Sequence, residues 1–201
     1  ILDANPSNQR SAMNDLVNLN GQVLPGDAPV ITLKNRAFHF GDGLFESMRV
    51  VDGRGCFLDA HWARLTTGAA LLRIDLPKNL DRSSFERYIN ELVQRTGLSN
   101  ARCRFTLYRD SDGYYRPSGN IGGFTFELSP VTEPTYTLNT NGALVDIWPE
   151  MRKPVNELSR HKTLNCQYYV MASLWAQQRG LDDCMLQNDR GNIIESSSGN
   201  L

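Results

Sequence analysis

Two helical patterns follow one another directly, between two groups of strand patterns, and this order constrains the fold more than any other feature. Apolar residues recur at helical spacing over residues 60–74, after the candidate N-cap Asp59. A second helix is expected after a capping box formed by Ser83 and Glu86. A further helix is expected at 165–179. Strands first, two helices, strands again and a late helix predict an α+β fold with two lobes.

Turn-forming residues separate the strand patterns. Asn20 and Gly21, between two short apolar runs, form the strongest hairpin signal, because both turn positions favour positive φ. Residues 110–120 are rich in turn formers and are expected to be a loop. The expected strands are 16–19, 22–24, 30–33, 44–51, 56–58, 102–108, 123–128, 143–148, 184–187 and 193–195.

The domain organisation follows from where these patterns begin and change. Residues 1–12 are polar and without pattern, so we interpret them as an extension ahead of a natural start near Met13. Residues 13–120 are expected to form an N-terminal α/β lobe. Residues 121–201 are expected to begin a C-terminal lobe.

Composition and charge exclude several classes of protein. The chain has 201 residues, with 21 Lys+Arg against 22 Asp+Glu, and this balance argues against nucleic-acid binding. We find no apolar run near the ~18 residues that span a bilayer, and no signal peptide opens the sequence. The four cysteines are too far apart for a CxxC motif, so no metal site is expected. Four free thiols are typical of a reducing cytosol, which predicts a cytoplasmic protein.

Three charged residues stand out because each lies beside a regular element. Lys162 precedes the last expected helix, Glu195 ends the last expected strand, and Arg64 lies one turn inside the first long helix. Taken singly, each of these residues is typical of a solvated surface charge. Asp42, in a Gly-Asp-Gly turn, and Glu46, on the strand that follows, also have ordinary structural interpretations.

The combination of motifs is more specific than its members. Residues 41–46 read Gly-Asp-Gly-Leu-Phe-Glu, residues 61–65 read His-x-x-Arg-Leu, residues 162–165 read Lys-Thr-Leu-Asn, and residues 195–201 read Glu-x-Ser-x-x-Asn-Leu. In this order, and with 33 positions from the lysine to the glutamate, the sequence resembles the class IV (fold-type IV) pyridoxal-phosphate enzymes. That family includes branched-chain and D-amino acid aminotransferases and aminodeoxychorismate lyases.

The resemblance implies roles for the residues that match the family motifs. Lys162 aligns with the catalytic lysine that forms a Schiff base with pyridoxal 5′-phosphate. Glu195 aligns with the carboxylate that pairs with the pyridine nitrogen, and Arg64 aligns with the arginine that binds the cofactor phosphate. Asn200 follows in the matching turn, with Ser197 and Ser198, as a further cofactor-binding candidate.

Substrate-binding residues are less clearly marked by the resemblance. Phe38 stands where D-amino acid enzymes carry a pocket tyrosine, and so lacks its hydroxyl. Arg104, Arg109 and Arg116 all lie on or after the strand that supplies the carboxylate-binding arginine, with Arg116 our first choice and Arg109 the next candidate. The Lys-Thr-Leu-Asn stretch is closer to the D-amino acid and lyase branches than to the branched-chain enzymes.

The family continues well past the motif that starts at Glu195. We therefore expect a two-lobed fold, similar to D-amino acid aminotransferase, whose C-terminal lobe is incomplete in this chain. The resemblance also implies a homodimer, in which a loop of one subunit completes the pocket of its neighbour. Two tyrosines, an arginine and a proline make residues 110–120 our candidate for that loop.

Three functions remain open at this point. The first is pyridoxal-phosphate-dependent transamination of an amino acid with a 2-keto acid through the Lys162 Schiff base. The second is a lyase on the same scaffold that splits aminodeoxychorismate. The third is a non-catalytic small-molecule binding module, for which a Schiff-base lysine and a paired carboxylate have no use.

Overall fold

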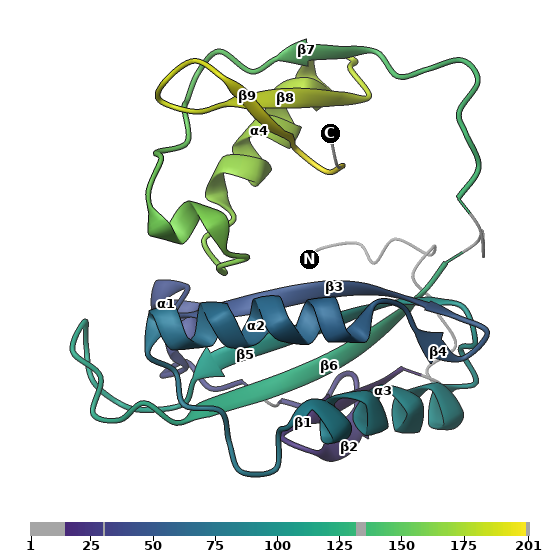
Figure 1. The fold of residues 1–201 in the computed structure, drawn as a ribbon, viewed down its shortest axis with the longest axis vertical. Coiled ribbons are helices and arrows are strands. Elements are labelled where there is room, and N and C mark those ends of the chain that lie inside the picture. The colour runs from purple at the N-terminus through teal and green to yellow at the C-terminus, as the bar shows by residue number, and fades with distance from the viewer. Residues whose placement is uncertain (1–14, 30, 132–135, 200–201) are drawn as a thin grey trace, which may run out of the picture. The chain divides into compact units, whose positions relative to one another are not determined.

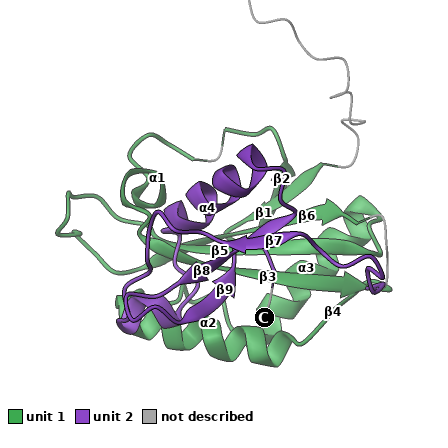
Figure 2. Ribbon diagram, turned by 90° about the horizontal axis from the view of Figure 1, so that it is seen from above, with its two compact units in different colours: residues 1–134 green, residues 135–201 purple. Residues whose placement is uncertain are grey.

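The computed structural model describes residues 15–29, 31–131 and 136–199 and divides into two compact units, 1–134 and 135–201 (Figure 2). This boundary lies later than the division predicted after residue 120. The reason is that β6 (Gly122–Pro130) pairs with β5 (Ala101–Arg109) along its whole length and so belongs to the first unit. The expected extension at 1–12 lies outside the described residues.

The first unit contains a six-stranded antiparallel sheet in the order β2-β1-β6-β5-β3-β4 (Figure 1). Its first hairpin confirms the Asn-Gly prediction, because Asn20 and Gly21 form the turn with φ values of 52° and 92°. The remaining strands of the sheet are β1 (Leu16–Leu19), β2 (Gln22–Pro25), β3 (Gly43–Val51) and β4 (Arg54–Gly55).

Two 15-residue helices, α2 (Leu58–Leu72) and α3 (Arg82–Thr96), pack on this sheet and share one apolar core with it (Figure 1). Phe85 of α3 lies at the centre of that core, with its ring centroid 5.1 Å from Phe105 and 5.3 Å from Phe126. Buried and more accessible residues alternate along β5 from Ala101 to Leu107, as expected for a strand with one face on the core.

The predicted helix starts need correction. Helix α3 begins at a capping box made by Asp81 and Ser84, in which each side chain binds the other's backbone N–H, and not at Ser83 and Glu86. Helix α2 begins one residue before Asp59, so that carboxylate lies inside the first turn instead of capping it. An acidic group there still interacts favourably with the N-terminal end of the helix.

The strand predicted at 30–33, before β3, is wrong for the part that the structure describes. Residues 31–33 form no strand, and residue 30 lies outside the described part of the chain. A short helix, α1 (Arg36–Phe40), follows with Asn35 as its N-cap. The partner predicted for β3 at 56–58 is also wrong, because β4 pairs two residues earlier and Leu58 already belongs to α2.

The second unit contains a three-stranded sheet in the order β7-β8-β9, with β7 parallel and β9 antiparallel to β8. Helix α4 packs on this sheet around Trp148, Trp175 and Leu186, which confirms the late helix followed by a hairpin. The elements are β7 (Val145–Ile147), the 3-10 helix η2 (Glu157–Arg160), α4 (Gln167–Gln178), β8 (Asp183–Gln187) and β9 (Ile193–Ser196).

No helix among the described residues is long and apolar enough to cross a membrane.

Candidate active site

Glu195, at the end of β9, is held by two side chains that sequence reasoning missed. Lys153 Nζ donates to Glu195 Oε1 at 2.5 Å, and the Tyr169 hydroxyl donates to Oε2 at 2.5 Å. Burial alone lowers the pKa of Lys153, but the hydrogen bonds with Glu195 and Tyr169 outweigh it and raise that pKa. Burial and the Glu195 carboxylate together raise the pKa of Tyr169. Both groups therefore stay protonated at neutral pH, as donors to Glu195.

Lys162 lies in the short connection between η2 and α4, as the sequence indicated. Its side chain is exposed, and the chain turns tightly beside it, with the Thr163 N–H donating to the His161 carbonyl at 3.0 Å. Helix α4 begins at Gln167, two residues later than predicted, after Cys166 as N-cap. Lys162 and Glu195 thus belong to the same compact unit.

The serines after Glu195 are fixed by a carboxylate from β8. Asp183 accepts hydrogen bonds from the Ser197 backbone and hydroxyl, and from the Ser198 hydroxyl at 2.9 Å. Burial raises the pKa of Asp183, but these hydrogen bonds, together with one from the Cys184 N–H at 2.7 Å, outweigh it and lower the pKa to about 2. The turn that leads toward Asn200 is therefore shaped by Asp183, while Asn200 itself lies outside the described residues.

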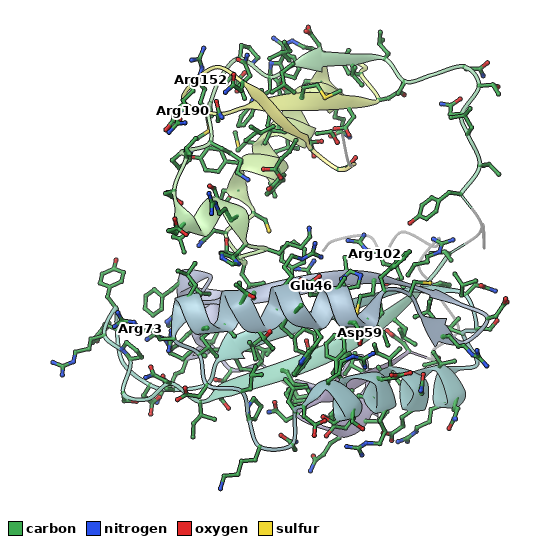
Figure 3. All side chains as sticks on the ribbon, viewed as in Figure 1. Glu46, Asp59, Arg73, Arg102, Arg152 and Arg190 are labelled. Atoms are coloured by element: carbon green, nitrogen blue, oxygen red, sulfur yellow. The ribbon has the colours of Figure 1, made fainter. Side chains whose placement is uncertain are left out.

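In the first unit, Arg64 is bound by a buried glutamate. Glu46 faces the core side of β3 with a side chain only 1% exposed (labelled in Figure 3). Arg64 donates from Nε to Oε1 at 2.8 Å and from Nη2 to Oε2 at 2.5 Å, and His61 Nδ1 lies 2.7 Å from Oε2. Burial raises the pKa of Glu46, but these partners outweigh it and lower the pKa. Arg64 itself is 43% exposed, so its guanidinium is fixed on one edge and accessible elsewhere.

Arg109, a predicted substrate-binding residue, is buried in a network of its own. Its guanidinium donates to Asp42 at 3.0 Å, to the Leu72 and Arg73 carbonyls, and to Asn120 at 2.8 Å. These contacts tie β5 to the end of α2 and to the base of the following loop. The structure thus gives Arg109 a structural role, and its role in substrate binding stays a prediction.

The loop at 110–120 is anchored through its backbone at Gly113 and Tyr114, and side chains near this anchor are exposed. Arg36 of α1 donates to the carbonyls of Gly113 and Tyr114, and also pairs with Asp42 at 2.7 Å. Beyond this anchor, Arg116 is exposed and Tyr115 is 90% exposed.

Substrate binding by Phe38 and Arg104 stays a prediction. Phe38, on α1, is 67% exposed. Arg104 stacks over the Phe45 ring at 4.3 Å on the sheet and is only partly exposed.

The described residues therefore divide the predicted site between the two units. The second unit holds Lys162 and Glu195, and the first holds Arg64 and the candidates for substrate binding. Within the described ranges, no group of three or more His, Cys, Asp or Glu residues could hold a metal ion.

Of the supporting residues missed by sequence reasoning, one carries a sequence signal and another does not. Glu46 stands at a core-facing position between Leu44 and Met48, and an acid in that register indicates a buried partner. Lys153 carries no such signal, because its contact with Glu195 spans 42 positions of sequence.

The family of the chain follows from its match to a family model. Residues 43–201, which include Glu46, Arg64, Lys162 and Glu195, match the model of amino-transferase class IV. The chain belongs to this family. Every motif on which the resemblance rests lies wholly or partly inside the matched range.

Two curated relatives represent the aminotransferase and lyase branches. The putative branched-chain-amino-acid aminotransferase of Methanocaldococcus jannaschii is 26% identical over 91% of this chain and 63% of its own length. The bifunctional aminodeoxychorismate lyase / D-amino acid transaminase of Mycobacterium tuberculosis is 37% identical over 53% of this chain and 37% of its own length.

Solved structures confirm the two-lobed fold-type IV architecture. The branched-chain aminotransferase of the archaeon Thermoproteus uzoniensis, solved with norvaline, has a TM-score of 0.78 at 20% identity, over 91% of this chain and 63% of its own. A second branched-chain amino acid aminotransferase, solved with pyridoxamine 5′-phosphate, has a TM-score of 0.78 at 22% identity. Class IV aminotransferases of this kind depend on pyridoxal phosphate.

The length of the chain also bears on the comparison. It covers 63% of the Methanocaldococcus jannaschii relative and 63% of the Thermoproteus uzoniensis structure. The chain thus spans less than two thirds of the length of these class IV relatives, which fits the expected incomplete C-terminal lobe.

Proposed function

We propose that this class IV protein catalyses transamination between an amino acid and a 2-keto acid with pyridoxal 5′-phosphate. The observation that carries the proposal is a pair of residues in the second unit, Lys162 and Glu195. This unit presents an exposed lysine at the family's lysine position together with a glutamate that two protonated side chains hold in place. An amine and a fixed carboxylate are the two groups that this chemistry requires from the protein.

The residues present fit the cofactor. When bound, pyridoxal phosphate supplies an aldehyde that binds amines and a ring that takes up the electron pair released at the substrate Cα. Lys162 would hold that aldehyde carbon, and then take the Cα proton once the substrate amine has replaced it. Glu195 would accept the ring N–H, since each of its oxygens has a second lone pair. Arg64 would bind the phosphate through the part of its guanidinium that Glu46 does not occupy.

Among the four lysines of the sequence, the structure favours Lys162 over Lys153 for the covalent role. The aldehyde and the ring nitrogen are at opposite ends of the pyridine ring, so one lysine cannot bind the first and contact the partner of the second. Lys153 contacts Glu195 directly, and its raised pKa keeps it an ammonium ion, which is no nucleophile. Lys34 and Lys78 are exposed residues of the first unit and match no family motif.

A lyase reaction is the second candidate. It would use Lys162, Glu195 and Arg64 in the same roles, but a leaving group would depart after proton removal instead of a proton returning to the cofactor carbon. The bifunctional relative from Mycobacterium tuberculosis, at 37% identity, supports this alternative because its name includes both activities.

The test is an assay panel on the full-length protein, which follows keto-acid formation from D- and L-amino acids beside aminobenzoate release from aminodeoxychorismate. We expect amino-group transfer, and Lys162→Ala should abolish it. Aminobenzoate release without amino-group transfer would favour the lyase. Neither activity, together with no reducible cofactor adduct, would favour a non-catalytic binding module and overturn the proposal.

A further inference from the structure

Lys153 is a buried cation placed by its backbone as well as by its side chain. It lies in the extended segment before η2, where its N–H donates to the Gln187 carbonyl at 2.9 Å and its carbonyl accepts from the Asp189 N–H at 3.0 Å. Both partners border the turn between β8 and β9. The segment is thus fixed against the same hairpin that carries Glu195.

The side chain of Lys153 completes a closed triangle of hydrogen bonds. Its Nζ lies 2.5 Å from Glu195 Oε1 and 2.7 Å from the Tyr169 hydroxyl, which in turn donates to Glu195 Oε2. The ammonium also lies 4.7 Å from the centre of the Tyr169 ring. Three separate parts of the second unit, the segment at Lys153, helix α4 and strand β9, therefore meet at one carboxylate.

The triangle differs from an ion pair that serves only the fold. The Lys153 side chain is 11% exposed and the Glu195 side chain is 34% exposed, so the ammonium group is buried and the carboxylate remains accessible. Each carboxylate oxygen accepts one bond within the triangle and keeps a second lone pair. The carboxylate plane is fixed by two donors on different oxygens, and Glu195 can still accept a third hydrogen.

We propose that Lys153 and Tyr169 are positioning residues that hold Glu195 as an oriented, charged acceptor for the ring nitrogen of pyridoxal phosphate. The inference rests on the proposed function and extends it to two residues outside the family motifs named above. An ammonium and a hydroxyl that bind a carboxylate stabilise its negative charge. The proton shared between the ring and Glu195 therefore stays on the nitrogen, where it strengthens the electron-accepting power of the ring.

The hydrogen bonds with Glu195 and Tyr169 raise the pKa of Lys153 against the effect of burial, so Lys153 stays an ammonium ion in this triangle. Tyr169 adds a donor without adding charge, so its contribution should be smaller than that of the ammonium. These differences give each variant a distinct expected result.

The test is the ¹⁵N resonance of the ring nitrogen, measured at pH 7.5 on full-length protein loaded with ¹⁵N-labelled pyridoxal phosphate. In Lys153→Met we expect the resonance to move toward that of unprotonated pyridine. In Tyr169→Phe the shift should have the same direction and a smaller size. Lys153→Arg, which keeps the charge, should move the resonance less than Lys153→Met, and the exposed control Lys78→Met should not move it.

Each other outcome counts against the inference. Resonances unchanged in both Lys153→Met and Tyr169→Phe would overturn it, and equal shifts in Lys153→Met and Lys153→Arg would overturn the role of the charge. If Lys153→Met does not fold, Tyr169→Phe alone decides, because it removes a single hydroxyl. Failure of the proposed function is distinguishable, since the wild-type protein would then form no borohydride-reducible adduct at Lys162.

Discussion

Glu46 determines how Arg64 can act. A carboxylate that is 1% exposed would be costly without partners, and Arg64 and His61 supply them from the first two turns of α2. Both Nε and Nη2 of Arg64 are used in this pairing, so the guanidinium is held in one orientation. The arginine proposed to bind phosphate is thus fixed before any ligand arrives.

Glu46→Gln should therefore weaken both folding and cofactor binding. The amide keeps the shape but leaves the Arg64 guanidinium without its counter-charge, at a cost of about 1–3 kcal/mol in the free energy of unfolding. We expect the affinity for pyridoxal phosphate to be roughly tenfold weaker, which corresponds to ~1.4 kcal/mol of binding free energy. Urea unfolding and absorbance titration of the apoprotein measure the two effects.

Glu86→Gln is the matched control for this prediction. Glu86 is 51% exposed and pairs with Arg82 one turn earlier on α3, so its loss should cost less than about 0.5 kcal/mol. Equal effects of the two substitutions would contradict the account of Glu46.

At this scale, residues in local motifs can be recognised from the sequence, whereas a supporting residue that lies far away along the chain, such as Lys153, cannot. Lys162 and Glu195 were recognisable because the family motifs are local and ordered along the chain. Lys153 was not, because an ion pair across 42 positions leaves no periodicity or spacing. For Arg109 the sequence indicated a candidate for substrate binding but not its structural contacts. A strand-end arginine gives no indication that Asp42, Asn120 and two backbone carbonyls accept its hydrogen bonds.

The hairpin of β8 and β9 depends on one carboxylate at its base. Asp183 has a folded-state pKa of about 2, below its ordinary value of 3.8, because hydrogen bonds from the serine turn outweigh burial. A lowered pKa means that this contribution to stability is fully present above pH ~4 and is lost as the pH falls from about 4 to about 2.

Asp183→Asn should destabilise the protein by about 1–2 kcal/mol at pH 7, because the turn at Ser197 and Ser198 loses a charged acceptor. The difference from wild type should shrink as the pH is lowered toward 2, where the wild-type carboxylate also becomes protonated. Urea unfolding at pH 7, 4 and 3 checks both statements. The exposed control Asp27→Asn should change little at any of these pH values, and a constant difference for Asp183→Asn across the series would contradict this account.

Elements were predicted better than their boundaries. The two helices on the sheet and the late helix have long apolar periodicities, and each was placed within about two residues of its observed start. The N-cap of α3 was not predicted, because Asp81 and Ser83 are both typical N-cap residues, and in the structure Asp81 forms the capping box with Ser84. The five-residue helix α1 was missed because it is too short for a period to show.

The molecule as a whole is expected to work as a homodimer. The loop at 110–120 presents Tyr114 and Tyr115, which are 86% and 90% exposed, while Arg36 binds the backbone carbonyls of Gly113 and Tyr114. Exposed aromatic side chains on an anchored loop are typical of interface residues. We therefore expect this loop to reach the neighbouring subunit and to help bind substrate there.

Tyr115→Ala or Arg116→Ala should weaken dimer association and raise KM by about tenfold, as expected for loss of an interface anchor. Covalent binding of the cofactor at Lys162 should be unchanged. Light scattering on full-length protein at micromolar concentration, beside the exposed control Lys78→Ala, measures the first effect. An active wild-type enzyme that remains monomeric under these conditions would contradict the prediction.

Peptide mapping identifies the lysine that binds the cofactor covalently. Full-length protein is loaded with pyridoxal phosphate, reduced with borohydride, digested and analysed by mass spectrometry. Residues 1–201 contain four lysines, Lys34, Lys78, Lys153 and Lys162, and the modified peptide identifies which of them carries an adduct. We predict one stoichiometric adduct on Lys162. An adduct on Lys153, or no specific adduct, would contradict the account.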